Sequence, residues 1–213
     1  MRILITNDDG FDAAGIKSLK KIALDMSTEE NIFVVAPKTN QSAKSRSVSY
    51  KTAFNIIKKN SNEYSVEGTP TDCIIFALDH IMKNKKPDII LSGINWGYNL
   101  SEDIFYSGTV AAAAEGADRG IPSIALSQAY QEPKEELNPY LFAESCGSKL
   151  CLSLYENFSA AFEKTALNVN FPANPIVKYP DCIKITQVGQ RERSNFGINI
   201  VSKSRNQYTA TID

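Results

Sequence analysis

The chain has 213 residues, long enough to bury a substantial apolar core without disulfide or metal staples. Hydrophobic residues make up 43% and charged residues 22% of the chain, close to the globular average, so a disordered or fibrous protein is excluded. The 23 basic and 24 acidic side chains give a net charge of −1. This balance argues against a protein that mainly binds nucleic-acid polymers or anionic membranes.

Histidine and cysteine are too scarce for several kinds of chemistry. His80 is the single histidine, which excludes a multi-histidine zinc or iron site. The four cysteines lie too far apart for CxxC pairs, so we interpret them as buried thiols. The N-terminus, MRILITNDD, resembles neither a signal peptide nor an apolar span of roughly 20 residues. The cytoplasm is therefore the expected compartment, with no membrane partner.

The first 36 residues predict a βαβ unit. Arg2 to Thr6 is a short apolar run that ends at Asn7-Asp8-Asp9-Gly10, whose turn-forming residues cannot continue a buried strand. From Gly15 onward, apolar residues recur at spacings of three and four, as in an amphipathic helix. Asn31 to Ala36 predicts a second buried strand. Such a unit implies parallel strands joined by a right-handed crossover.

The next segment predicts a loop, two strands and a helix. Residues 38–47 are polar and indicate a long loop, whereas Ser47 to Lys51 and Asn62 to Glu67 alternate like strands with one face in solvent. Thr69-Pro70-Thr71-Asp72 is a typical helix start, with Thr69 as the N-cap and an acid three residues later. We expect this helix to continue to about Met82.

A third core strand is predicted from Pro87 to Ser92, followed by a turn at Gly93-Ile94-Asn95-Trp96-Gly97. Ser107-Gly108-Thr109 then opens an alanine-rich helix from Val110 to Ala117. Ile121 to Ser127 predicts a fourth strand.

The remaining chain predicts a long helix from Asn138-Pro139 to about Glu156, and later strands at Ala166 to Asn170 and Ile183 to Val188. There is no internal repeat or obvious linker, so we expect one domain over residues 1–213. The alternation of strands and helices favours an α/β fold with a doubly wound sheet and β insertions.

Polar residues follow each of the first three core strands. Asp8 and Asp9 follow the first, Asn40 and Ser42 the second, and Asn95 the third. Because ligands of open parallel sheets bind beyond the carboxyl ends of the strands, these loops can converge on one point. Adjacent aspartates stay ionised most readily beside a cation, and carboxylate, amide and hydroxyl oxygens suit Mg²⁺, Mn²⁺ or Ca²⁺. The alternative is that the aspartates belong to a solvated turn.

Ser107-Gly108-Thr109 can supply the complementary half of a phosphate site. Two hydroxyls and a glycine at a helix start present free N–H groups and the positive end of the helix dipole to an anion. Taken alone, this tripeptide is more often an ordinary N-cap. A hard cation beside such a helix start is what metal-assisted hydrolysis of a phosphate ester needs.

Several blocks, in chain order, resemble the signatures of the stationary-phase survival protein SurE family. They are ILITNDDG with Gly15-Ile16, VVAPKTNQS, GTPTDC, SGINWGYN, and YSGTVAAAAEG followed by GIPSIALS. The resemblance covers roughly residues 1–170. It implies a Rossmann-like three-layer αβα fold with a mostly parallel sheet and β-hairpin insertions.

The resemblance also implies a function and a set of site residues. Members of the family are metal-dependent phosphatases of nucleoside 5′- and 3′-monophosphates, with some action on short polyphosphate, and form dimers or tetramers. The implied partners are thus nucleoside monophosphates and further copies of the chain, and the implied cofactor is one divalent cation per subunit, Mg²⁺ or Mn²⁺. The implied metal ligands are Asp8, Asp9, Ser42 and Asn95, and the implied phosphate contacts are Asn40, Ser107, Gly108 and Thr109. Either Asp8 or Asp9 would act as the general base.

The chain departs from the family pattern in two respects. Ala43 and Ser101 stand where many members have glycine, which we expect to alter loop flexibility more than chemistry. Members also usually continue into a strand-like segment of the type GYVSITPL, which is not found before Asp213. We therefore expect a domain without the family's usual C-terminal segment.

Two other classes of protein remain as alternatives. A phosphoacceptor signalling domain also places acids after its first strand, but the third core strand here ends in Ser-Gly-Ile-Asn without an aspartate to phosphorylate. A catalytically weak nucleotide- or phosphate-binding regulatory module of the same fold would retain the ligands without turnover. Trp96 and Tyr98 flank Asn95 and could stack on a base, although loop aromatics more often pack locally.

Overall fold

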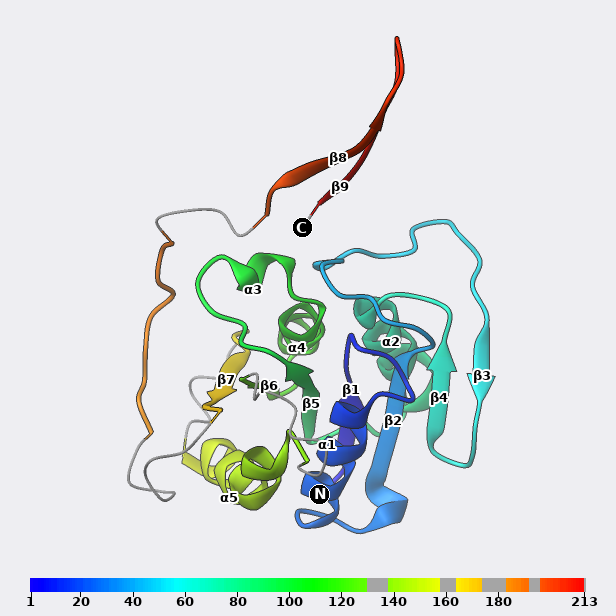
Figure 1. Cartoon of the computed structure of the whole chain (residues 1–213). Helices are drawn as coiled ribbons and strands as arrows, with labels where there is room; N and C mark the ends of the chain where they lie inside the picture. Colours follow the sequence, from blue (N-terminus) through cyan, green and yellow to red (C-terminus); the bar gives the residue numbers. More distant parts are fainter. Residues whose placement is uncertain (130–137, 158–163, 174–182, 192–195, 213) are drawn as a thin grey trace.

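A computed structural model of the chain (Figure 1) describes residues 1–129, 138–157, 164–173, 183–191 and 196–212. Its centre is a seven-stranded sheet in the order β3-β4-β2-β1-β5-β6-β7, in which every neighbouring pair is parallel except β3 and β4. The strands are β1 (Ile3–Thr6), β2 (Ile32–Pro37), β3 (Ile56–Lys58), β4 (Glu63–Val66), β5 (Ile89–Trp96), β6 (Ser123–Gln128) and β7 (Leu167–Phe171).

Helices cover both faces of this sheet because its central strands are apolar on both sides. Helices α1 (Ala14–Leu24) and α5 (Leu141–Asn157) pack on the face that carries Ile3 and Ile5. Helices α2 (Pro70–Phe76) and α4 (Gly108–Asp118) pack on the face that carries Leu4. The three-layer αβα architecture and the mostly parallel sheet expected from the sequence are thus confirmed. None of the helices in the described part of the chain combines the length and the apolar character needed to span a membrane.

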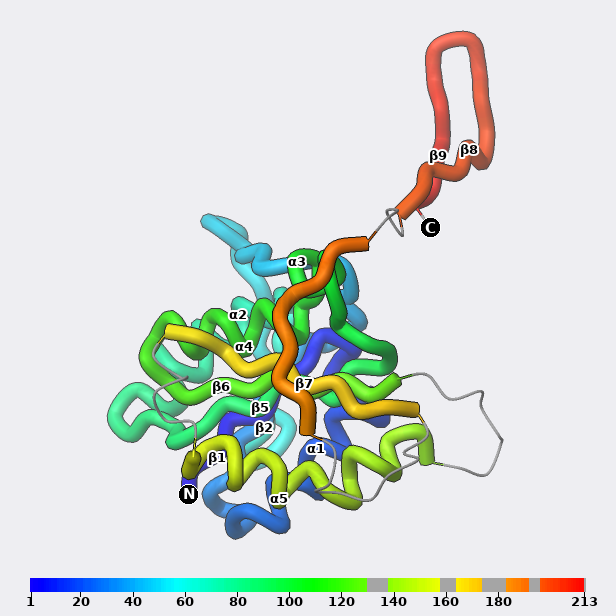
Figure 2. Tube along the Cα trace, turned by 90° about the vertical axis from the view of Figure 1, so that its left-hand side faces the viewer, coloured from blue at the N-terminus to red at the C-terminus, as the bar shows by residue number. Residues whose placement is uncertain are grey.

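Shorter elements complete the described structure. A 3₁₀ turn, η1 (Glu29–Asn31), precedes β2, a π-helical turn, η2 (Ala77–Ile81), continues α2, and a short helix, α3 (Asp103–Tyr106), precedes α4. Strands β8 (Ile198–Lys203) and β9 (Tyr208–Ile212) form a separate antiparallel hairpin. This hairpin projects away from the layered body (Figure 2).

The helix caps predicted at Thr69 and Ser107 are confirmed. The Thr69 hydroxyl accepts from the backbone N–H of Asp72, and an Asp72 carboxylate oxygen accepts from the backbone N–H of Thr69, which completes a capping box. The Ser107 hydroxyl accepts from the backbone N–H of Val110 at 3.1 Å and caps α4.

The strand predicted at Ser47 to Lys51 is wrong, because the polar groups of this segment bind the start of α2 instead of a neighbouring strand. The backbone N–H and the hydroxyl of Ser49 donate to the two carboxylate oxygens of Asp72, at 3.0 and 2.7 Å. The Ser47 carbonyl accepts from the Thr69 hydroxyl at 2.7 Å. Side-chain hydrogen bonds of this kind compete with a strand ladder.

The strand predicted at Ile183 to Val188 is also wrong, and this segment is exposed and forms no strand. Its alternation of apolar and polar residues is typical of a strand, but alternation does not supply a neighbour to pair with. The sequence also did not predict β3, α3 or the β8–β9 hairpin.

The third core strand is longer than predicted, because the expected turn at residues 93–97 is mostly part of β5. The strand continues to Trp96, with an irregularity in its pairing to β6 between Ser92 and Asn95. Gly93 has a φ of +136°, and a Cβ at this position would lie 2.3 Å from the carbonyl oxygen of Leu126. Only glycine tolerates both this conformation and this approach.

Both residues that replace an expected glycine adopt a left-handed backbone. Ala43 has a φ of 59° and Ser101 a φ of 50°, a region that costs a residue with a Cβ roughly 1–2 kcal/mol.

We expect Ala43→Gly and Ser101→Gly each to raise the free energy of unfolding by about 0.5 kcal/mol, because relief of strain exceeds the added entropy of the unfolded chain. Urea denaturation measures this change. Ala53→Gly is the matched control, since Ala53 lies in the same loop as Ala43 and is not among the positive-φ residues. It should be destabilising, and equal effects of Ala43→Gly and Ala53→Gly would contradict the strain argument.

Candidate active site

The acidic pair lies in a tight turn at the carboxyl end of β1. Asn7 braces this turn: its side-chain nitrogen donates to the Gly10 carbonyl at 2.9 Å, and its side-chain oxygen accepts from the Gly10 N–H at 3.3 Å. Asp8 is buried and Asp9 is partly buried. The two carboxylates are therefore held at the sheet edge where ligands of parallel sheets bind.

Asp8 packs directly against the start of α4. The Thr109 hydroxyl donates to Asp8 Oδ1 at 2.5 Å. A Cβ on Gly108 would lie 2.7 Å from the Asp8 Cβ and 3.0 Å from Asp8 Oδ2, closer than real contacts allow. The absence of a side chain at Gly108 is thus what permits the acidic turn and the helix start to meet.

The environment raises the pKa of both carboxyl groups. Burial raises the pKa of Asp8, against hydrogen bonds from the Thr109 hydroxyl and from the backbone N–H groups of Thr109 and Gly108, which favour the charged form. Burial, and then the neighbouring Asp8 charge, raise the pKa of Asp9 to about 6. The backbone N–H of Trp96 opposes this shift.

Asp9 Oδ2 is buried and has no hydrogen-bond partner among the described residues. A buried carboxylate oxygen without a partner is costly unless something positively charged compensates it. The described residues contain no cluster of three His, Cys, Asp or Glu side chains, so a metal here would need neutral ligands beside the two aspartates. The oxygen-rich donor set fits a hard divalent cation.

Asn95 lies near the end of β5, and its side-chain nitrogen donates to the Gly97 carbonyl at 3.0 Å. This hydrogen bond occupies the amide nitrogen, so the amide oxygen is the atom suited to a cation. The backbone N–H of the next residue, Trp96, bonds the Asp9 carboxylate. The structure therefore brings the end of β5 next to the acidic pair, as the sequence predicted.

The loop after β2 also reaches the acidic turn. The backbone N–H of Gln41 donates to the Asp8 carbonyl at 2.7 Å. Asn40 Oδ1 accepts from the backbone N–H of Ser42 at 2.7 Å, which folds this part of the loop into a local turn. Both side chains are exposed. Asn40 and Ser42 are thus held near Asp8 by the backbone of the residue between them.

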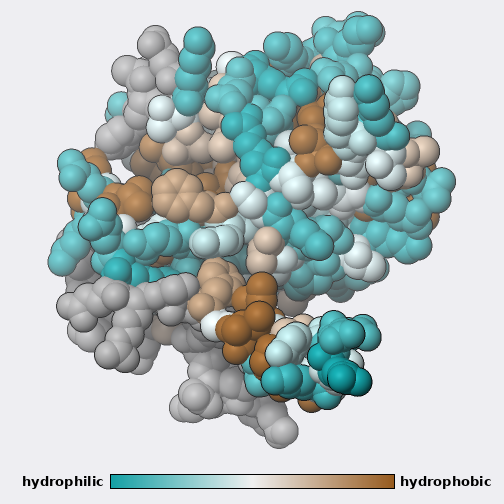
Figure 3. Space-filling model, turned by 90° about the horizontal axis from the view of Figure 1, so that it is seen from above, coloured by the Kyte–Doolittle hydropathy of each residue, from teal (hydrophilic) through white to brown (hydrophobic). Residues whose placement is uncertain are grey.

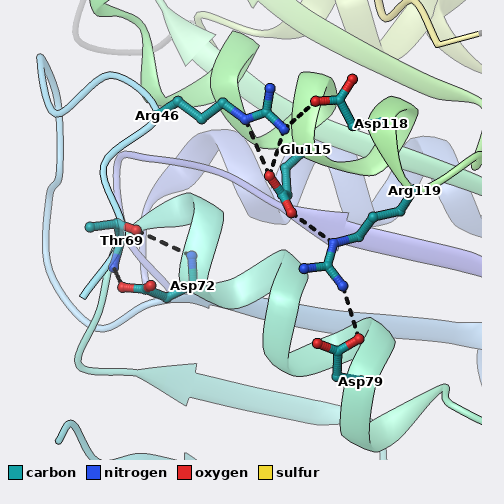
Figure 4. A network of polar contacts seen from close by, with 7 residues as sticks. All are labelled: Arg46, Thr69, Asp72, Asp79, Glu115, Asp118 and Arg119. Carbon is teal, nitrogen blue, oxygen red and sulfur yellow. Dashed lines mark hydrogen bonds and ion pairs between the residues drawn. The ribbon is translucent and has the colours of Figure 1, made fainter. Parts of the chain in front are cut away.

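A network of ion pairs, which sequence analysis missed, anchors the same loop to α4 (Figure 4). Arg46 donates to Glu115 and to Asp118 on α4. Glu115 also pairs with Arg119 at 2.7 Å, and Arg119 pairs with Asp79 at 2.8 Å. Glu115 and Arg119 are four residues apart, a spacing that predicts an ion pair on one helix. Nothing in the sequence predicts the contact of Arg46 with a helix about 70 residues away.

Ser45 adds a second anchor for this loop. Its backbone N–H donates to the Tyr106 carbonyl at 2.9 Å and its hydroxyl to the Phe105 carbonyl at 2.6 Å. Both acceptors belong to α3, directly before Ser107. The loop with Asn40 and Ser42 is therefore tied to the segment that leads into the candidate phosphate site.

The fold is that of a three-layer α/β protein with an acidic turn packed on a helix start, and comparison with known proteins gives its family. Residues 3–195 match the model of the family "Survival protein SurE". The chain belongs to this family.

Named relatives and a solved structure agree with this assignment. The "5′-nucleotidase SurE" of Wolbachia pipientis wMel is 47% identical over 180 residues, covering 84% of this chain and 68% of that protein. The protein of the same name from Methylocella silvestris is 40% identical over 206 residues, covering 96% and 78%. The crystal structure of the SurE protein from Aquifex aeolicus has a TM-score of 0.80 at 32% identity, covering 100% of this chain and 82% of that one.

We expect Gly108→Ala to lower phosphatase activity at least about 100-fold, since misplacement of catalytic groups by about 1 Å has effects of this size, and the added methyl group displaces Asp8. Steady-state kinetics and circular dichroism measure activity and folding. Gly197→Ala is the control, because a Cβ there meets no atom within 4 Å. Full activity of a folded Gly108→Ala variant would contradict the proposed role of this contact.

Proposed function

We propose that this protein is a metal-dependent 5′-nucleotidase, which hydrolyses nucleoside monophosphates to nucleoside and phosphate. The observation that carries the proposal is the contact of Asp8 with Thr109 and Gly108, which sets an acidic pair against a helix start. Carboxylates for a cation and a helix start for an anion are the two halves of a phosphomonoesterase site. Membership of a family with relatives named 5′-nucleotidase supports this assignment.

The proposed ligands of one divalent cation, Mg²⁺ or Mn²⁺, are Asp8, Asp9, Ser42 and Asn95. The unpartnered Asp9 Oδ2 supports this proposal. When bound, the cation would lower the pKa of water and offset charge on the phosphoryl oxygens. One of the two aspartates takes the proton of the attacking water as general base.

The start of α4 is the proposed phosphate site, with contacts from Ser107, Gly108 and Thr109 and an additional one from Asn40. The N–H groups at the first turn of a helix attract anions. Those of Gly108 and Thr109 bond the Asp8 carboxylate, so in this proposal the phosphate shares them with Asp8. The Thr109 hydroxyl donates to Asp8. In this proposal Thr109 therefore also fixes the position of a metal ligand.

We extend the proposal to 3′-nucleotides and short polyphosphate, because the candidate contacts recognise a terminal phosphate and a cation rather than one position on a sugar. Phosphate release from 5′-AMP, 3′-AMP and tripolyphosphate tests the substrate range. Turnover of 5′-AMP alone would restrict the protein to its 5′ activity.

We expect Asp9→Asn to bind Mn²⁺ much more weakly and to lose at least about 100-fold in phosphate release, because removal of one charge leaves a single carboxylate for the cation. Calorimetry with chelator-treated protein and phosphate release from 5′-AMP measure the two effects. Asp12→Asn, three residues along the chain and exposed, is the matched control and should match the unmutated protein. Full activity and unchanged metal affinity of Asp9→Asn would contradict the proposed site.

We also propose that the chain forms homodimers or homotetramers through the β8–β9 hairpin. Ile198 pairs with Ile212 and Ile200 with Ala210 across the hairpin, so these residues lie on one face. All four are exposed. An isolated two-stranded hairpin is marginally stable in water, so a partner for this apolar face is expected.

We expect Ile198→Asp combined with Ile200→Asp to convert the assembly to a smaller species, measured by light scattering after size-exclusion chromatography. Charges on this face carry a desolvation cost at any interface that buries it. Asn199→Asp, on the opposite face of the hairpin, is the control and should leave the mass unchanged. An unaltered mass of the double variant would contradict an interface at the hairpin.

The chain is proposed to act as one domain over residues 1–213 and to work in the cytoplasm. Cys73, Cys146 and Cys151 are buried free thiols, which agrees with a reducing compartment. The fourth cysteine, Cys182, lies outside the described residues.

A further inference from the structure

Trp96 is a large apolar side chain at the candidate active site that no proposed role uses. It is the single tryptophan of the chain and directly follows Asn95, and 37% of it is exposed. Its backbone N–H donates to the Asp9 carboxylate. Trp96 is therefore one residue away from one proposed metal ligand and one hydrogen bond away from another.

The backbone around Trp96 is fixed on both sides. The Asn95 side chain closes a turn onto the Gly97 carbonyl, and the Gly97 N–H donates to the Gln128 carbonyl at 2.8 Å. The Trp96 ring meets Tyr140 edge-on, with centroids 6.0 Å apart and an interplanar angle of 86°. An aromatic ring held in place before a ligand arrives loses little conformational entropy on binding.

Trp96 and the proposed phosphate site lie toward opposite faces of the sheet, at the carboxyl ends of its strands. Alternation along β5 puts Trp96 on the same face as Ile94, which packs in the core beneath α1 and α5. Asp8, in contrast, contacts α4 on the opposite face. A phosphate at α4 and a base at Trp96 would place the nucleoside across the carboxyl ends of β1 and β5, where ligands of such sheets bind.

We propose that Trp96 is a specificity-determining residue, on whose indole the nucleobase of the substrate stacks. This inference rests on the proposed nucleotidase function and extends it to a preference for nucleotides over sugar phosphates. Stacking uses the π-face that every base has, so the residue selects for the presence of a base more than for its identity.

Trp96→Ala and Trp96→Phe, assayed with 5′-AMP and with ribose 5-phosphate, test the inference. These two substrates share the sugar and the phosphate, and only 5′-AMP has a base. Trp96→Ala should raise KM for 5′-AMP about tenfold and leave kcat and the KM for ribose 5-phosphate unchanged, and Trp96→Phe should restore most of the affinity. Tyr50→Ala is the control, because Tyr50 is an exposed aromatic residue (78%) on a different loop, and it should leave both KM values unchanged.

Two kinetic results would overturn the inference. An unchanged KM for 5′-AMP would show that the base does not use the indole. An equal rise of KM for both substrates would show that Trp96 only supports the structure around Asp9.

Binding measured without turnover separates failure of the stacking from failure of the proposed function. If the unmutated protein hydrolyses neither substrate, the nucleotidase proposal fails, and the fluorescence of the single tryptophan still reports on stacking in the presence of Mg²⁺. Quenching by 5′-AMP but not by ribose 5-phosphate would support stacking on Trp96, and no quenching by 5′-AMP would overturn it.

Discussion

The contact between Asp8 and the first turn of α4 is the constraint on which the candidate site depends. Three elements meet there: the end of β1, the start of α4, and Pro70 of α2, whose Cγ is 3.1 Å from where a Gly108 Cβ would lie. Because interiors are close-packed, this meeting point has no room for a side chain. The placement of the acidic pair is therefore a consequence of how the layers pack.

Two kinds of segment carry the residues of the candidate site. Asp8, Asp9 and Asn95 lie at the ends of central strands, which are set by the buried sheet. Asn40 and Ser42 lie on a loop held by polar bonds through Ser45, Arg46 and Ser49, most of them exposed. Exposed ion pairs contribute only about 0–1 kcal/mol each, so the loop can adjust to a ligand while the strand ends stay fixed.

The layered body and the β8–β9 hairpin differ in how far their residues are buried. The layered body buries its apolar residues on both faces of the sheet. In contrast, every residue of β8 and β9 is exposed. The space-filling view from above shows hydrophobic surface beside this part of the chain (Figure 3). Arg191 binds Glu102 and Asp103 near α3, and the Phe196 ring packs on Tyr106. Arg191 and Phe196 are thus held next to the candidate phosphate site.

Sequence analysis succeeded where local signals and burial agree. The strand β1, helix α1 and strand β2 follow from apolar periodicity alone, and the caps at Thr69 and Ser107 follow from local hydrogen-bonding chemistry. The convergence of Asp8, Asn95 and the loop after β2 follows from the rule that parallel strands end at one edge. These features require no knowledge of distant contacts.

The incorrect predictions concern segments whose structure depends on contacts with residues far along the chain. Ser49 belongs to a strand by alternation, but Asp72, 23 residues away, takes both its donors. The sequence around Arg46 predicts only an ordinary surface cation, because its ion pairs with α4 depend on the packing of that helix beside the loop. Ile183 to Val188 alternates as a strand does, but a strand exists only where a neighbour supplies hydrogen bonds, and that neighbour is a property of the whole fold.

The burial of the acidic pair shows why the fold and the proposed chemistry belong together. A solvated turn would leave both carboxylates in water with ordinary pKa values, whereas burial and mutual repulsion raise the pKa of Asp9 to about 6. A chain selected for stability alone would avoid a buried oxygen without a partner. Asp9 Oδ2 has none among the described residues. The free-energy cost of burying this oxygen is explained if a cation binds to it. In that case metal binding and folding stability are linked.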